Sequence, residues 1–391
     1  MDNPFRYGSV VSGDHFTGRE KELATLEMEM RSGQNVVIIS PRRHGKTSLV
    51  FRAIDRLRRQ GMLVAYFDMM AAPTKELLAD GLADALYSGL GGVKDRALNR
   101  VREFFGRVSI SPTVTLNPDG SQTFGVASSA RDRETDAILK RLFELPEQVA
   151  RDGRKVAVVL DEFQEAPALD PHLPALVRSV WQMQQNVSHV FLGSKRHMMT
   201  RLFTETNEPM FRMALPLVLG PISASNFANY IRERFVSTGI AIEDDAVKLI
   251  LEITACHPGD TQELAHFTWA LAATEKIPAT RELVGRALVQ VIQAEDSRYT
   301  ILWDRLSPHQ RLMLTALLGS GGASSIYSEA YRRRYRLGAP SSVNRSLTAL
   351  MNSDLVEESP PGQYRIPDPF FRDWLSRLTK VGAGSVPPSI M

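Results

Sequence analysis

Short apolar runs alternate with segments of helical periodicity through the first half of the chain. Most of these runs carry no charge, as expected for strands that are covered on both faces. We therefore expect strands at residues 35–40, 63–68, 155–160, 188–193 and 215–219. Apolar residues recur at helical spacing from 46 to 59, which predicts a helix directly after the first strand. This order predicts an α/β fold with a parallel five-stranded sheet and helices on both faces.

The second half of the chain has a different pattern. The segments from 223 to 297 are helical throughout and predict a helical lid. Residues 298–380 show three helical segments and then two short strands around Pro360-Pro361-Gly362, which predicts a winged helix-turn-helix domain. The predicted organisation is an N-terminal segment (1–15), an α/β core (16–222), the lid (223–297), the winged helix (298–380) and a disordered tail (381–391).

One segment interrupts the α/β pattern of the core. Between about residues 105 and 133, alternating strand residues flank Asn117-Pro118-Asp119-Gly120, a strong turn signal. We expect a β-hairpin inserted into the core here.

Composition excludes several classes of protein. With 391 residues, of which 43% are hydrophobic and 23% charged, the chain has the composition of a multidomain globular protein. It has no uncharged apolar stretch of about 18 residues and no leader-like start, so we expect a soluble, cytoplasmic protein with no membrane partner. The single cysteine, Cys256, excludes an intramolecular disulfide framework and a cysteine-rich zinc site.

Charge is nearly balanced over the whole chain, at +3, but is unevenly distributed. From Thr300 to the end there are 11 basic and 7 acidic residues, a net charge of +4. The basic excess therefore belongs to the predicted winged helix, the part in which contact with nucleic acid is to be considered.

A phosphate-binding loop is predicted between the first strand and its helix. The segment 40–47 matches the pattern G-x-x-x-x-G-K-[ST] except that Ser40 replaces the first glycine. Backbone N–H groups at a helix N-terminus attract phosphate, and Gly45 permits its close approach. We expect Lys46 to neutralise the β- and γ-phosphates and Thr47 to ligate Mg²⁺. The alternative is a basic helix start after a buried strand. The expected nucleotide-contacting residues are Ser40, Pro41, Arg42, Arg43, His44, Gly45, Lys46, Thr47 and Ser48.

Two adjacent carboxylates, Asp161 and Glu162, follow the apolar run 156–160. The carboxyl edge of a parallel sheet is where such folds bind ligands, so both side chains are expected beside the phosphate-binding loop. Asp161 is expected to hold Mg²⁺, and Glu162 to orient and polarise the attacking water. The alternative is a pair of solvated acids that cap the next segment.

Together these motifs resemble the AAA+ superfamily, and more closely its archaeal-type ATPase branch, which is related to the origin-recognition and STAND signalling ATPases. The box Phe16-Thr17-Gly18-Arg19-Glu20-Lys21-Glu22-Leu23 precedes the phosphate-binding loop as in that branch. The resemblance implies ATP and Mg²⁺ as cofactors and Gly18 and Arg19 as contacts of the nucleotide base. A plain turn and helix cap remains the alternative for this box.

The resemblance also implies two further catalytic residues. Ser194, after the fourth strand, matches the polar sensor, and Arg212, before the fifth strand, matches an arginine that faces a neighbouring subunit's γ-phosphate. Ser194 as a capping hydroxyl and Arg212 as a surface ion-pair residue are the alternatives, and Arg196 competes for the role of Arg212.

The winged helix supplies candidate DNA contacts. Arginine forks onto guanine or phosphate and asparagine pairs with adenine, so such residues on a recognition helix are typical of DNA binding. The candidates are Arg332, Arg333, Arg334, Asn344 and Arg345. The same fold also serves as a packing or protein-interaction module.

The function predicted from these features is that of an ATP-binding and ATP-hydrolysing AAA+-type protein. Its nucleotide cycle is expected to move a winged-helix domain that contacts DNA. The alternative is a nucleotide-gated, STAND-like switch whose winged helix binds protein partners. A homo-oligomer is compatible with either function.

Overall fold

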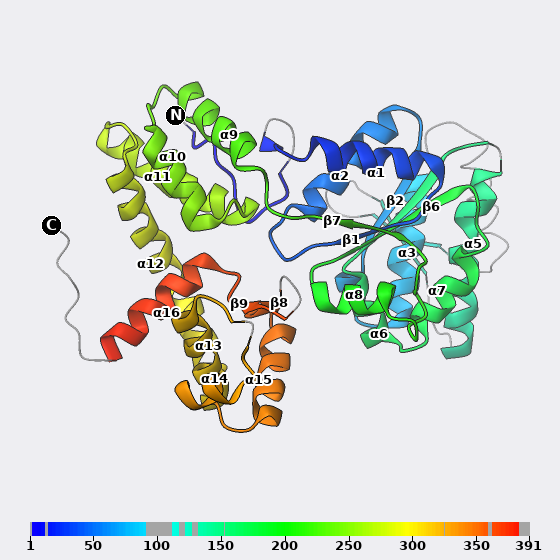
Figure 1. Ribbon diagram of the computed structural model, residues 1–391. Helices are drawn as coiled ribbons and strands as arrows, with labels where there is room; N and C mark the ends of the chain where they lie inside the picture. Colours follow the sequence, from blue (N-terminus) through cyan, green and yellow to red (C-terminus); the bar gives the residue numbers. More distant parts are fainter. Residues whose placement is uncertain are drawn as a thin grey trace. The chain divides into compact units, whose positions relative to one another are not determined.

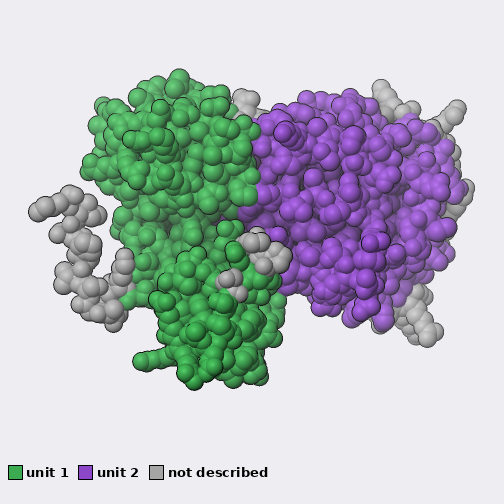
Figure 2. Space-filling view, viewed as in Figure 1, with its two compact units in different colours: residues 1–9, 221–391 green, residues 10–220 purple. Residues whose placement is uncertain are grey.

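The computed structural model describes residues 2–11, 15–90, 112–116, 122–126, 132–151, 153–323, 325–358 and 362–382. The chain forms two compact units, shown in separate colours in Figure 2. One consists of residues 10–220 and is called here the α/β unit. The other, called here the helical unit, consists of residues 1–9 and 221–391.

The α/β unit is built on a five-stranded parallel sheet with the order β2-β5-β6-β1-β7. Its strands are β1 (Val36–Ile39), β2 (Leu63–Asp68), β5 (Val156–Asp161), β6 (Val187–Gly193) and β7 (Leu215–Val218). All five lie within one residue of the ranges that the apolar runs predict. The predicted α/β class with a parallel sheet is therefore confirmed.

Alternate residues of the inner strands β1, β5 and β6 enter two different cores. In β1, Val36 and Ile38 pack against α1 (Glu20–Ser32) and α2 (Lys46–Arg59) on one face of the sheet. Val37 and Ile39 pack on the other face. That second face is covered by α3 (Lys75–Leu90), α5 (Asp132–Ala150), α7 (Leu173–Trp181) and α8 (Arg196–Thr204) (Figure 1). The inner strands β1, β5 and β6 are covered on both faces and are therefore mostly apolar, with Asp161, Ser188 and His189 as their polar residues.

A two-stranded antiparallel sheet lies between α3 and α5 in the chain. It pairs β3 (Pro112–Leu116) with β4 (Gln122–Val126), with Val114 opposite Phe124. The turn residues Asn117 to Gly120, on which the predicted hairpin depends, lie outside the described residues.

The helical unit contains a group of helices followed by a winged helix. The first group is α9 (Ala224–Ser237), α10 (Asp244–Thr254), α11 (Pro258–Glu275) and α12 (Arg281–Arg305). The winged helix comprises α13 (Pro308–Ser320), α14 (Glu329–Arg334), α15 (Pro340–Asn352), β8 (Glu357–Glu358), β9 (Tyr364–Arg365) and α16 (Pro369–Gly382). Ala323 and β8 both pair with β9 to form the wing.

The helical unit has one continuous apolar core that also includes Phe5 from the start of the chain. Phe5 packs against the rings of Tyr230 and Phe235 on α9. Helix α12 runs without a break past residue 297, so the boundary predicted there between lid and winged helix falls inside one helix.

No helix in the described part of the chain is both long enough and apolar enough to cross a membrane.

Candidate functional site

The carboxyl ends of three adjacent strands carry the predicted chemistry. Strand β6 lies between β1 and β5, with Ile39 opposite Gly193 and Leu160 opposite Phe191. The phosphate-binding loop leaves β1, Ser194 follows β6, and Asp161 and Glu162 end β5. Strand order thus brings together side chains that are up to about 150 residues apart in the chain, at the edge where open α/β sheets bind ligands.

The phosphate-binding loop connects β1 to α2 in a compact turn. Gly45 is the N-cap of α2 and has φ +82°, a left-handed conformation that glycine adopts at little cost. The ammonium group of Lys46 is buried and donates hydrogen bonds to the carbonyl oxygens of Ser40 (3.3 Å) and Pro41 (3.2 Å). The lysine charge therefore lies within the curve of the loop, beside the N-terminus of α2, and helix N-termini attract phosphate.

Arg19 connects the first sequence box to this loop. Its side chain is almost fully buried and donates to the carbonyl oxygens of His44 (3.2 Å) and Gly220 (2.5 Å). It also pairs with Glu22 at 3.0 Å. The preceding Gly18 has φ +69°, so the backbone turns just before α1. Arg19 therefore braces the phosphate-binding loop, while its predicted contact with the nucleotide base stays a prediction.

Asp161 is the buried carboxylate of the site. Its Oδ2 accepts hydrogen bonds from the hydroxyls of Thr47 (3.2 Å) and Tyr66 (2.8 Å). Burial raises the pKa of Asp161 above its usual range, although hydrogen bonds from Tyr66 and the Glu162 N–H act in the opposite direction. A nearby cation would stabilise the ionised form of such a group.

The donor set of Thr47 and Asp161 fits Mg²⁺. Hydroxyl and carboxylate oxygens are its preferred ligands, and in nucleotide sites it takes only one or two from the protein, with phosphates and water completing the shell. No cluster of three or more acidic, histidine or cysteine ligands occurs among the described residues, so they offer no all-protein metal cage.

Glu162 is held by donors from two directions. Its Oε2 accepts from the Ser194 hydroxyl (2.7 Å), the Ser194 N–H (3.2 Å) and the Gln164 amide (2.5 Å). Burial acts to raise its pKa, but these hydrogen bonds and the charge of Lys46 outweigh burial and lower the pKa below the usual range. Glu162 is therefore ionised at neutral pH and can accept a proton.

Two residues of this site escape sequence reasoning. Tyr66 lies inside the apolar run of β2 and Gln164 within the short 3₁₀ turn Phe163–Glu165. The only sequence signal for Gln164 is a polar residue two positions after Glu162. Tyr66 carries no signal, because its hydroxyl reaches Asp161 only through the pairing of β2 with β5.

One candidate arginine begins α8 and the other follows it in the chain. Arg212 is exposed, has φ +56°, and its guanidinium lies 5.1 Å from the centroid of the Phe211 ring. Arg196 is the first residue of α8 and is half-buried. The role of either arginine toward a neighbouring subunit stays a prediction.

The candidate DNA contacts on the winged helix differ in their surroundings. Arg332 is half-buried and donates to the carbonyl oxygens of Tyr327 (3.1 Å) and Gly338 (2.7 Å), so its guanidinium connects the segment before α14 to the turn between α14 and α15. Arg333, Arg334, Asn344 and Arg345 are exposed. Arg333 pairs with Glu329 at 2.6 Å and Asn344 accepts a hydrogen bond from the Tyr327 hydroxyl at 3.1 Å.

Comparison with known proteins agrees with this geometry. The family model described as an ATPase domain predominantly from Archaea matches residues 16–264, and that of a probable winged helix domain matches residues 297–377. No curated protein sequence gives a significant match.

Solved structures share the fold over nearly the whole chain. The Walker-type ATPase of Pyrococcus abyssi has 16% identity and a TM-score of 0.65, covering 95% of this chain and 99% of its own. The Aeropyrum pernix ORC2 protein in its ADPNP–ADP complexes has 15% identity and a TM-score of 0.55, covering 97% and 100%. The Aeropyrum pernix ORC1 protein in complex with DNA has 17% identity and a TM-score of 0.50, covering 95% and 96%.

The site geometry and the family match lead to one assignment. A strand-loop-helix phosphate site lies beside a buried carboxylate pair, and the match spans more than half of the chain and covers this whole site. The resemblance inferred from the motifs is confirmed, and the chain belongs to the family of ATPase domains found predominantly in Archaea, here joined to a winged helix domain.

Proposed function

We propose that the protein binds ATP with Mg²⁺ at the phosphate-binding loop and hydrolyses it to ADP and inorganic phosphate. The observation that carries this proposal is the convergence of Lys46, Thr47, Asp161 and Glu162 at the carboxyl ends of β1 and β5, the two strands that flank β6. The positive charge of Lys46 lowers the pKa of Glu162, so the two side chains lie close enough to interact. This supports a site in which Lys46 and Glu162 act on the same bound ATP molecule.

Each residue has a separate task in this reaction. Lys46 and the N–H groups that open α2 bind the β- and γ-phosphates, and Thr47 and Asp161 would hold the metal ion. Bound there, Mg²⁺ supplies positive charge that offsets the charge of the phosphates. Glu162 orients a water molecule and accepts its proton as the water oxygen bonds to the γ-phosphorus. The bond from that phosphorus to the β–γ bridging oxygen breaks, and ADP leaves with the electron pair.

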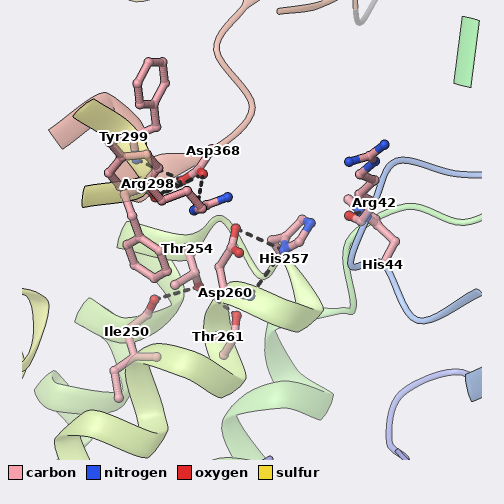
Figure 3. A network of polar contacts seen from close by, with 12 residues as sticks. Arg42, His44, Ile250, Thr254, His257, Asp260, Thr261, Arg298, Tyr299 and Asp368 are labelled. Atoms are coloured by element: carbon pink, nitrogen blue, oxygen red, sulfur yellow. Dashed lines mark hydrogen bonds and ion pairs between the residues drawn. The ribbon is translucent and has the colours of Figure 1, made fainter. Parts of the chain in front are cut away.

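We further propose that the nucleotide cycle moves the lid and winged helix as a single body. Figure 3 shows Asp368, at the start of α16, with Tyr299 and Arg298 of α12. The Tyr299 hydroxyl donates to Asp368 at 3.1 Å, and the Trp374 indole donates to Asp296 at 2.8 Å. Because α12 also packs against α11, these contacts support a rigid connection between the two parts of the helical unit.

The winged helix is proposed to contact duplex DNA through the exposed residues Arg333, Arg334, Asn344 and Arg345. They lie on α14 and on the first turns of α15, where a recognition helix contacts bases and phosphates. The ORC1 protein of similar fold is described in complex with DNA, which supports the same class of partner here.

A second candidate function is a nucleotide-gated switch whose winged helix binds a protein. The observation that favours it is the engagement of Arg332 by two backbone carbonyls and of Arg333 by Glu329. The first contact occupies N–H donors of Arg332, and the second offsets the charge of Arg333, so both leave α14 with less to offer phosphates.

Nucleotide binding is tested by calorimetry with Mg²⁺ and ATP. Lys46→Ala should abolish measurable binding, because it removes the charge that faces the β- and γ-phosphates. The matched control is Lys195→Ala, because Lys195 lies in the same unit and its ammonium group pairs with Glu165. This variant should bind ATP as the wild type does. Equal ATP affinity of the Lys46→Ala variant refutes the assignment of the loop.

DNA binding is tested by fluorescence anisotropy with labelled duplexes at several salt concentrations. Replacing Arg333 and Arg334 by Ala should lower the slope of log K against log salt by about one per lost phosphate contact, uniformly across sequences. Replacing Asn344 or Arg345 should cost ~1–3 kcal/mol at particular base pairs. Arg281→Ala, which removes one exposed charge outside the winged helix, is the control. Absence of wild-type binding at low salt, with ATP, with ADP and without nucleotide, favours the protein-binding switch.

An arginine supplied by a neighbouring subunit is tested by ATP turnover at varied protein concentration. If Arg212 acts in this way, specific activity should rise with concentration in the wild type and stay low in Arg212→Ala. A specific activity independent of concentration contradicts the proposal.

A further inference from the structure

Gln164 is a buried polar residue to which the hydrolysis scheme above assigns no task. It lies in the 3₁₀ turn directly after the two carboxylates, and only 1% of its surface is exposed. Its amide nitrogen donates to Oε2 of Glu162 at 2.5 Å and more weakly to Oε1 of Glu165 at 3.4 Å. The turn therefore directs the Gln164 side chain back toward the residue proposed as the base.

The orientation of the Gln164 amide is determined by Glu162. An ionised carboxylate only accepts hydrogen bonds, so the amide must direct its NH₂ group toward Glu162. Its oxygen consequently points into the protein, where no donor from the described residues reaches it. A buried acceptor without a donor destabilises a fold, and an apolar side chain of similar size would avoid that cost. The hydrogen bond to Glu162 therefore demands an explanation other than packing.

The end of β6 leaves room for this amide. A Cβ atom on Gly193 would lie 2.3 Å from Oε1 of Gln164 and 2.3 Å from Cγ of Met199. Any side chain at position 193 would thus displace Gln164 or Met199. The residue next to Gly193 is Ser194, which donates to the same Oε2 of Glu162.

Donors from both sides consequently determine the position of the Glu162 carboxylate. The Ser194 hydroxyl and N–H and the Gln164 amide all reach Oε2, and none of these three donors is directed to Oε1. Glu162 itself has a left-handed backbone with φ +52°, a conformation that non-glycine residues adopt at a cost and that is frequent at functional sites.

We propose that Gln164 is a positioning residue for hydrolysis: its amide, together with Ser194, holds Oε2 of Glu162 so that Oε1 is presented to the attacking water. This inference rests on the proposed function, because it requires Glu162 to be the base. Gln164 contacts neither water nor phosphate in this scheme. Its effect should therefore fall on kcat and leave ATP binding unchanged.

The test compares Gln164→Met with the wild type. Methionine has nearly the same length and volume but donates no hydrogen bond. Gln184→Met is the matched control, because Gln184 lies in the same unit and has a similar environment. Its amide nitrogen donates to the Phe143 carbonyl at 2.7 Å, and its buried amide oxygen has no donor among the described residues. Each protein is measured for ATP turnover, for ATP affinity by calorimetry and for thermal unfolding.

We expect Gln164→Met to lower kcat by about 10- to 100-fold, because misplacing a catalytic group by about 1 Å can cost about 100-fold in rate. Its Kd for ATP should stay within about two-fold of the wild type, and Gln184→Met should retain wild-type kcat. A wild-type kcat in Gln164→Met overturns the inference. An equal loss of kcat in Gln164→Met and Gln184→Met also overturns it, because it would show that Gln164 has a merely structural role.

A second variant and the wild-type assay separate the remaining outcomes of this test. If Gln164→Met does not fold, Gln164→Asn retains a buried amide but is one methylene too short to reach Oε2, and the same loss of kcat is expected. A wild-type protein that binds ATP without hydrolysing it refutes the proposed hydrolysis, and the role of Gln164 falls with it. A wild type that turns over ATP while Gln164→Met does so equally well refutes the role of Gln164 alone.

Discussion

Replacing Glu162 by glutamine should stop ATP turnover without weakening ATP binding, and the structure gives the physical reason. Ser194 and Gln164 direct three donors at Oε2 of Glu162. In the Glu162→Gln variant these donors select the amide oxygen, because an NH₂ group cannot accept them. The NH₂ group then occupies the position of Oε1, where it donates a hydrogen bond to water and cannot take a proton from it.

The size of the effect follows from the role of a general base. Removing such a base costs about 10²- to 10⁴-fold in rate, which corresponds to ~2.7–5.4 kcal/mol of activation free energy at ~1.36 kcal/mol per factor of ten. The free energy of unfolding should change by only about 1–2 kcal/mol, since the three hydrogen bonds remain and lose only their charge-assisted part. The loss of a buried charge acts in the opposite direction and limits the change further.

The assay measures steady-state phosphate release and ATP affinity by calorimetry on the same preparation. Glu165→Gln, a change of the same chemistry three residues along the chain, is the control and should retain turnover. Turnover of the Glu162→Gln variant within about ten-fold of the wild type would refute the assignment of Glu162 and place the base elsewhere. A parallel loss of ATP affinity would show that the carboxylate shapes the binding site itself.

Two further predictions concern the helical unit. Arg332→Ala should lower the free energy of unfolding by ~1–3 kcal/mol, because the carbonyls of Tyr327 and Gly338 lose a charged donor. Chemical denaturation measures this loss, and the control Arg345→Ala should be as stable as the wild type. Equal stability of the two variants would contradict an anchoring role for Arg332. Burial raises the pKa of Asp368 above its usual 3.8, so the folded state binds this proton more tightly than the unfolded state does. The contribution of Asp368 to the free energy of unfolding therefore grows as pH falls through its raised pKa and disappears as pH rises above it. Relative to the non-titrating Asp368→Asn, the wild type should gain stability from about pH 7 to about pH 4, and a difference that is flat or falls would refute the assignment.

The sequence by itself determined the local features of this protein. The five strands, the helix that follows the first strand and the phosphate-binding loop between them depend on apolar periodicity and on the nearby residues Gly45, Lys46 and Thr47. Such signals are contained within about fifteen residues, so they can be interpreted without knowledge of the fold. The adjacent pair Asp161 and Glu162 was equally visible, because it directly ends an apolar run.

Only the tertiary structure decided which residues share the site. The order of strands is set by pairing between distant segments. It places β6 beside β5, so that Ser194 reaches Glu162, and β2 on the other side of β5, so that Tyr66 reaches Asp161. The sequence also left open what individual polar side chains do. Arg332 has the same residue type as its neighbours but turns inward to backbone carbonyls. A hydrogen bond depends on distance and direction in three dimensions, and residue type and local spacing do not specify either.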